Sequence, residues 1–100
     1  MQYILVIEFE STGETTCSVK GLPESIIRNL EIYFKTNNIN CKNERNCFEV
    51  DTEGINLLNV LCGPGYNFRV TTHSMAIDTT AIGGRSVKVQ KTIWTLSIAQ

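Results

Sequence analysis

The sequence predicts an α+β fold, a ββαββαββ two-layer sandwich in which two helices cover a mostly antiparallel six-stranded sheet. Three observations lead to this prediction. Several short segments alternate apolar and polar residues, as half-buried strands do. Two other segments carry apolar residues at helical spacing, each between its own start and stop signals. No linker, repeat or low-complexity stretch divides the 100 residues, so we expect a single domain over residues 1–100.

The first two strands are predicted at the start of the chain. Residues 2–7 form a continuous apolar run, which is typical of a central strand buried on both faces. Ser11-Thr-Gly-Glu14 then supplies a turn, and residues 15–20 alternate apolar with polar side chains. We therefore expect the second strand to fold back on the first as a hairpin.

A first helix is predicted after Gly21-Leu-Pro23. Proline fits the first helical position because its fixed φ is already helical and no intrahelical hydrogen bond is lost there. Asn37-Asn38 provides a stop signal. The predicted buried stripe consists of Ile26, Ile27, Leu30, Tyr33 and Phe34.

A short hairpin and a second helix are predicted next. The hairpin joins residues 39–42 to residues 46–50, with Phe48 and Val50 on one face. Asp51-Thr52 is expected to cap the helix, which Gly63-Pro64-Gly65 closes. Its predicted buried stripe consists of Ile55, Leu58 and either Leu61 or Cys62.

The last third of the chain, 66–100, predicts one long hairpin with its turn at Gly83-Gly84. In the return arm, Val87 and Val89 are in one phase of the alternation, whereas Trp94 and the apolar residues after it are in the other. Such a change of phase predicts a bulge near Lys91. The neutral stretch from Thr92 to Ala99 has few charges to protect a sheet edge, so we expect another copy of the chain to cover it.

Charge and hydropathy argue against two classes of partner. The net charge of −1 and the scattered Lys and Arg residues do not favour nucleic acid. The apolar start at residues 1–7 is interrupted by Glu8 and Glu10 and lacks a preceding basic region, so it does not resemble a secretory signal. No apolar run reaches membrane-spanning length. We expect a cytoplasmic protein that binds neither nucleic acid nor membrane.

The four cysteines are predicted to be reduced thiols, because no secretory signal is present. Cys17 and Cys62 are expected in the core. Cys41 and Cys47 flank a turn-rich pentapeptide and are candidates to face each other across a hairpin. Their spacing does not match a zinc site, and the single histidine is distant, so we expect no metal and no cofactor.

Two other candidate sites are weaker. His73 is the only histidine, but no spacing places it beside a cysteine nucleophile, and an exposed strand residue is the preferred interpretation. Residues 78–87 contain Gly83-Gly84 followed by Arg85 and Ser86, a composition that can bind an anion. The segment lacks the P-loop spacing and precedes a strand rather than a helix, so a hairpin tip is the preferred interpretation.

Four stretches, in the same order, resemble the GTP cyclohydrolase I feedback regulatory protein family. The first is Met1-Gln-Tyr-Ile-Leu-Val-Ile7, with an aromatic third residue leading into an apolar strand. The second is Asn46-Cys-Phe-Glu-Val-Asp51, which precedes a leucine-rich short helix. The third is Tyr66-Asn-Phe-Arg-Val70 with Ser74-Met75, and the fourth is Gln90-Lys-Thr-Ile-Trp-Thr-Leu96. The chain departs from the family pattern by about a dozen extra residues between Met75 and Val89, judged against usual hairpin loops, and by the lack of a basic residue in 8–11.

The resemblance implies a non-enzymatic regulatory subunit. Proteins of that family form pentameric rings that dock on GTP cyclohydrolase I, with phenylalanine and tetrahydrobiopterin as effectors. The ligand-binding positions that the resemblance implies here are Gln90, whose amide both donates and accepts hydrogen bonds, and the end of the first strand at Phe9, Glu10 and Ser11. A solvated strand residue is the other interpretation of Gln90.

Two alternative functions fit the same sequence. One is an oligomeric, sponge-like protein that sequesters a small nucleotide messenger, for which the glycine-containing tip at 83–84 is the relevant feature. The other is a small ferredoxin-like enzyme that uses His73. Composition does not distinguish the regulatory, nucleotide-binding and enzyme hypotheses.

Overall fold

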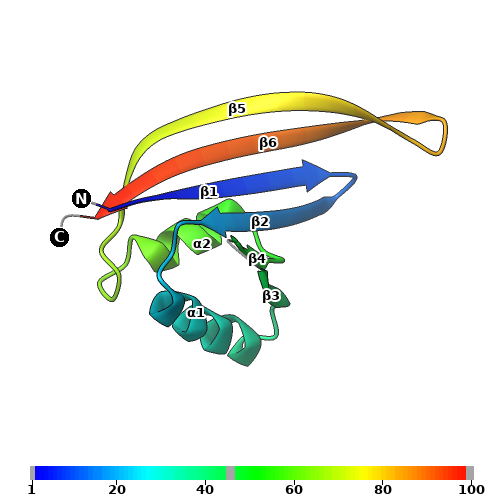
Figure 1. The fold of residues 1–100 in the computed structure, drawn as a ribbon. Coiled ribbons are helices and arrows are strands. Elements are labelled where there is room, and N and C mark those ends of the chain that lie inside the picture. Colours follow the sequence, from blue (N-terminus) through cyan, green and yellow to red (C-terminus); the bar gives the residue numbers. More distant parts are fainter. Residues whose placement is uncertain (1, 45–46, 99–100) are drawn as a thin grey trace.

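The architecture is one antiparallel sheet with two helices on one face. The computed structural model describes residues 2–44 and 47–98. The elements follow in the predicted ββαββαββ order, and the strand order across the sheet is β3-β4-β2-β1-β6-β5 (Figure 1). The strands are β1 (Gln2–Ser11), β2 (Glu14–Lys20), β3 (Cys41–Glu44), β4 (Cys47–Val50), β5 (Arg69–Ile82) and β6 (Arg85–Ile98), and the helices are α1 (Glu24–Thr36) and α2 (Gly54–Leu61). The predicted fold class is therefore confirmed. Met1, Asn46 and Ala99, which bound predicted segments, lie outside the described residues.

β1 lies at the centre of the sheet, between β2 and β6, but only one of its faces is fully buried. Ile4 and Val6 are almost completely buried beneath the helices, whereas Tyr3 and Leu5 on the other face are 59% and 38% exposed. The prediction that this strand is buried on both faces is wrong for a single chain. Its apolar run instead supplies a core face and a second, open apolar face.

The core lies between the sheet and the helices. Its largest fully buried side chains are Phe34, Phe48, Phe68, Ile4, Leu30, Leu57, Leu61 and Leu96. In α1, Ile27, Leu30 and Phe34 are buried as predicted, while Tyr33 remains 47% exposed at the border of the stripe. Pro23 is not the first helical residue but the extended residue just before it, at φ −62° and ψ 148°, and its carbonyl accepts the first helical hydrogen bonds.

α2 begins later than predicted and presents a different face. Glu53, rather than Asp51 or Thr52, is the residue that precedes the helix. Leu57, Leu58 and Leu61 are buried, whereas Ile55 is 57% exposed. Leu57 faces the core, and because successive helical residues are about 100° apart, Ile55 lies about 200° away around the helix and faces outward. The predicted burial of Ile55 is therefore wrong.

β5 and β6 form a long two-stranded hairpin, called here the β5–β6 ribbon. It extends beyond the turn between β1 and β2 (Figure 1). Its turn is at Gly83 and Gly84 as predicted, with φ of +57° and +81°, angles at which glycine carries little steric penalty. β5 begins at Arg69 rather than at Tyr66, which lies in the preceding turn. The pairing irregularity lies in β5, between Val70 and Thr72, and not near Lys91.

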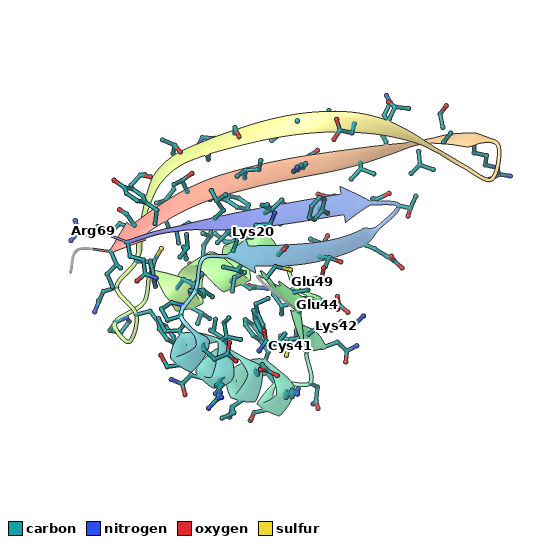
Figure 2. The ribbon with its side chains drawn as sticks, in the orientation of Figure 1. Lys20, Cys41, Lys42, Glu44, Glu49 and Arg69 are labelled. Atoms are coloured by element: carbon teal, nitrogen blue, oxygen red, sulfur yellow. The ribbon has the colours of Figure 1, made fainter. Side chains whose placement is uncertain are left out.

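The two edges of the sheet differ in charge. β3, at one edge, carries Lys42 and Glu44, and Lys42 is opposite Glu49 of β4 (Figure 2). At the other edge is β5, whose residues 70–77 contain no Asp, Glu, Lys or Arg. β6 pairs on both sides, so its stretch beginning at Thr92 does not form the edge that was predicted there. The unprotected neutral edge is β5. Neither helix in the described part of the chain is long and apolar enough to cross a membrane.

Candidate functional site

A hollow of about 260 Å³ lies where the β1–β2 turn meets the long ribbon. Glu10 is directly opposite Gln90, and Gln90 is directly opposite Ile77, so three neighbouring strands contribute side chains from one row. The turn itself is tight, with Thr12 at φ +48° and Gly13 at φ +82°. Because the ribbon continues past this turn, its side chains form a wall beyond the end of β1. The lining residues are Glu10, Ser11, Thr12, Gly13, Ile77, Lys88 and Gln90.

The hollow contains both a negative and a positive side chain. Glu10 and Lys88 are exposed, and Gln90 is half-buried between them in the sheet. The two ion pairs found within residues 2–44 and 47–98 are both on α1, so Glu10 and Lys88 do not neutralise each other. In that same part of the chain, no side-chain hydrogen bond engages Glu10, Lys88 or Gln90. A carboxylate, an ammonium and a carboxamide are thus free to bind a ligand.

The structure brings together three of the four residues implied by the resemblance. Glu10, Ser11 and Gln90 all line the hollow. Phe9 does not, because successive strand residues point to opposite faces of a sheet. Its ring is on the open face, 37% exposed, with the Lys91 ammonium 5.7 Å from the ring centroid.

Lys88 was missed by sequence reasoning. It precedes Gln90 by two residues on the same strand, so the alternation that assigns a face to one assigns it to both. That signal was present in the sequence. What the sequence did not show is how far the β5–β6 ribbon extends past the β1–β2 turn. The register of β1 with β6 determines this, and it places Gln90 opposite Glu10.

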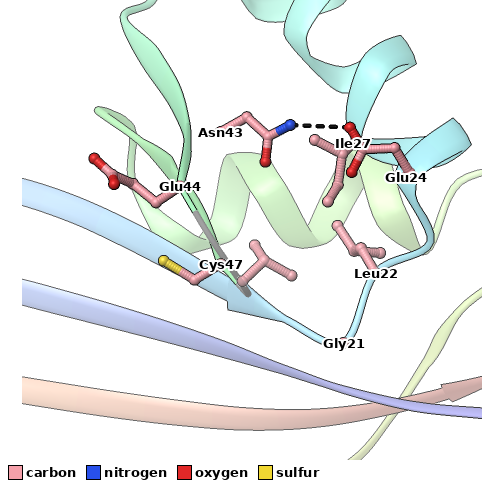
Figure 3. Close-up of a pocket in the computed structure, with 8 residues that line it drawn as sticks. Gly21, Leu22, Glu24, Ile27, Asn43, Glu44 and Cys47 are labelled. Carbon is pink, nitrogen blue, oxygen red and sulfur yellow. Dashed lines mark hydrogen bonds between the residues drawn. The ribbon is translucent and has the colours of Figure 1, made fainter.

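A larger cavity of about 560 Å³ lies between the start of α1 and the β3–β4 hairpin (Figure 3). It contains the carboxylates of Glu24 and Glu44 and the thiol of Cys47. The Asn43 side-chain amide donates a hydrogen bond of 3.1 Å to Glu24 Oε1, and Arg28 Nε lies 3.9 Å from the same oxygen. Glu24 therefore already has polar partners that tie α1 to β3, and we assign this carboxylate a structural role.

The four cysteines range from buried to exposed. Cys17 is completely buried, and its Sγ donates a hydrogen bond of 3.3 Å to the Thr52 carbonyl. Burial, and to a smaller extent the Glu8 carboxylate, raises the pKa of this thiol from 9.0 to about 12. Cys62 is exposed, contrary to its predicted place in the core. Cys41 pairs with Val50 and Cys47 with Glu44, so the expected pairing of Cys41 with Cys47 across the hairpin is wrong.

His73 lies on β5 opposite Trp94 and is exposed. None of the hydrogen bonds, ion pairs or ring contacts found in the described residues involves it. Across residues 2–44 and 47–98, no three His, Cys, Asp or Glu side chains are grouped closely enough to hold a metal ion. The search for known relatives adds no assignment: no family model matches the chain, and no curated protein shows significant similarity to it.

Proposed function

We propose that this protein is a non-enzymatic regulatory subunit that binds an enzyme partner and a small zwitterionic effector. Its resemblance to the feedback regulatory family suggests GTP cyclohydrolase I as the partner. The same resemblance suggests phenylalanine and tetrahydrobiopterin as effectors, and we propose the cytoplasm as the compartment. The ββαββαββ element order, on which the resemblance partly rests, supports this proposal.

The observation that supports the proposal most is the mixed charge of the hollow at the β1–β2 turn. A free amino acid carries one ammonium and one carboxylate on the same carbon, and charge-assisted hydrogen bonds to both are the strong ones. Glu10 suits the ammonium, Lys88 suits the carboxylate, and Gln90 both donates and accepts. Ile77, which is 62% exposed, offers apolar contact to the amino-acid side chain.

Regulation by such a site follows from linkage. An effector shifts association only by the difference between its affinities for the complex and for the separate proteins. The hollow adjoins the β1–β2 turn, and the β5–β6 ribbon extends past that turn (Figure 1). A partner docked there is therefore positioned to contact the same ligand. We therefore place the partner against the β1–β2 turn and the inner face of the ribbon.

Self-association is part of the proposal, with a pentamer as the assembly that the resemblance suggests. β5 has a free edge with an uncharged stretch at 70–77, and natural sheets usually cover or protect such edges. Tyr3 and Leu5 leave apolar surface on the open face nearby. Sedimentation velocity at about micromolar protein, a concentration at which specific oligomers persist, should show an oligomer, and a monomer would contradict this part.

The test of the proposed function is calorimetric titration of L-phenylalanine into the protein, alone and with GTP cyclohydrolase I. Replacing either charge of the hollow removes one charge-assisted bond, so Glu10→Gln and Lys88→Gln should each weaken binding by about tenfold or more. Lys35→Gln on α1 is the matched control, since Lys35 faces Glu31 far from the hollow. 3-Phenylpropionate, which lacks the ammonium, should bind as poorly to the parent protein as phenylalanine binds to Glu10→Gln.

Three outcomes would count against this function. Absence of a complex with GTP cyclohydrolase I, with and without phenylalanine or tetrahydrobiopterin, would reject the partner. Stoichiometric, reversible retention of a cyclic nucleotide would favour the sponge-like alternative. Turnover that is lost in His73→Ala without loss of stability would favour an enzyme.

A further inference from the structure

A second concave site lies between the two helices and is separate from the hollow at the β1–β2 turn. Its volume is about 520 Å³, within the range of about 300–1,000 Å³ that is usual for small-molecule sites. The end of α1, the following loop and one side of α2 form its walls. The lining residues are Tyr33, Phe34, Asn37, Ile39, Asn56, Asn59 and Val60.

Helical spacing explains why these residues meet. Asn56, Asn59 and Val60 are three and four positions apart, so they share one face of α2. On the facing side, Tyr33 and Asn37 are four positions apart at the end of α1. The two helices therefore present a polar row to each other across the groove.

The loop that follows α1 forms the third wall. Asn38 has a φ of +60°, a left-handed conformation that asparagine tolerates at helix ends. This residue turns the chain back, so that the Ile39 N–H donates a hydrogen bond of 2.8 Å to the Phe34 carbonyl. Ile39 is thereby positioned against the core, where it adds apolar surface to the groove.

The asparagine side chains retain unused hydrogen-bonding groups. Asn37 donates from its amide nitrogen to the Tyr33 carbonyl at 2.8 Å, and Asn56 donates to the Thr52 hydroxyl at 3.2 Å. Each keeps a carbonyl oxygen with no hydrogen-bond donor among the described residues. Asn59 makes no side-chain hydrogen bond in that part of the chain and offers both a donor and an acceptor.

The apolar portion of the groove includes an aromatic ring in a defined position. Tyr33 packs edge-on against Phe34, with ring centroids 5.2 Å apart and planes at 77°. The Tyr33 side chain is 47% exposed, so part of it remains available for contact with another ring. None of the seven lining side chains carries a charge at neutral pH.

We infer that this helix groove binds an uncharged, nucleobase-sized heteroaromatic molecule. An aromatic and aliphatic wall suits a flat ring, and asparagine amides suit the paired donors and acceptors at the edge of a heterocycle, as in asparagine contacts to adenine. The lack of charge argues against a phosphate or a carboxylate as the group that is recognised. The site shares no residue with the hollow of Glu10 and Lys88, so it is a separate site on the same chain.

The probe for this site is adenine, titrated into ¹⁵N-labelled protein and followed by two-dimensional NMR. Saturable shifts should be confined to residues around Asn59 and the end of α1. Asn59→Leu should weaken adenine binding about fivefold or more, as expected for one lost hydrogen bond. Asn29→Leu, at an exposed α1 position outside the groove, is the matched control and should leave the affinity unchanged.

Two comparisons make the result decisive. AMP should bind no more tightly than adenine, because no cation lines the groove to hold its phosphate. A much tighter AMP complex, shifts centred on Lys88, or equal losses in Asn59→Leu and Asn29→Leu would each overturn the inference. So would the absence of saturable shifts up to about 5 mM adenine, since binding weaker than that is too weak for a specific site.

Discussion

Replacing Gly54 with alanine should destabilise the protein, although alanine is the better helix former. Gly54 is the first residue of α2 and is buried. A Cβ added there would lie 2.6 Å from Trp94 Cη2, 2.7 Å from Trp94 Cζ3 and 3.0 Å from Glu8 Oε2. Neither neighbour can yield without loss, because the indole packs against the core and the carboxylate accepts a hydrogen bond of 2.6 Å from the Gly54 N–H.

The opposing effects differ in size. Helix propensity favours alanine over glycine by at most about 1 kcal/mol. Overpacking a core costs about 1–3 kcal/mol, and a hydrogen bond to a charged group contributes about 1.5–3 kcal/mol. With the hydrogen bond weakened rather than lost, the net change should be a destabilisation of about 1–3 kcal/mol. For a domain of this size, that lowers the melting temperature by about 4–24 °C.

The assay is urea unfolding followed by Trp94 fluorescence, at one fixed protein concentration because assembly would add to stability. Gly65→Ala is the matched control. A Cβ at Gly65 meets nothing within 4 Å, so this change should be neutral or slightly stabilising. If Gly54→Ala were as stable as the parent protein, the close packing of Trp94 and Glu8 on α2 would be refuted.

Three further predictions concern the same core. Leu57→Ala should lower the free energy of unfolding by about 2–5 kcal/mol because it leaves a cavity. Ile55→Ala, at a side chain that is 57% exposed, should lower it far less. Equal losses in urea unfolding would contradict the assigned face of α2. Glu8→Ala should lower the free energy of unfolding by about 1.5–3 kcal/mol, because it removes the charged acceptor of the Gly54 N–H. Glu8→Gln should lose less in thermal melts, and identical losses would argue against a hydrogen-bonding role. The pKa of Cys17 is raised from 9.0 to about 12, so the folded state holds this proton more tightly than the unfolded chain does. The resulting stabilisation is complete below about pH 9 and is lost as the pH rises towards 12, and Cys17→Val should flatten that decline in urea titrations.

The element order could be predicted because turn and helix signals are local. Gly83-Gly84 is one example, since two residues with positive φ join the strands where the sequence indicates. Pro23 and the α1 stripe are others, each correct to within one or two residues. Errors arose where the tertiary context decides, as in α2. There the start of the helix depends on Glu8, which is 46 residues away and accepts a hydrogen bond from the Gly54 N–H.

The candidate hollow was predictable only in part, for a similar reason. Gln90 and Glu10 were identified separately, but their pairing depends on the register between β1 and β6, which no local pattern specifies. Lys88 joins them because the ribbon runs past the β1–β2 turn. The helix groove was not predicted at all, since its two rows of side chains come from helices separated in sequence and meet only after both pack on the sheet.

The predicted bulge near Lys91 was wrong for a reason that bears on assembly. β6 continues without a bulge there, so Val87 and Val89 lie on the open face and Leu96 lies on the core face. Apolar residues in both phases indicate a sheet with two apolar faces, and the two helices of this chain cover only one. Tyr3 and Leu5 extend the same open face in β1. Because natural sequences are usually consistent between local pattern and final burial, we expect an assembled state to cover the apolar residues of this open face, Tyr3 and Leu5 in β1 and Val87 and Val89 in β6.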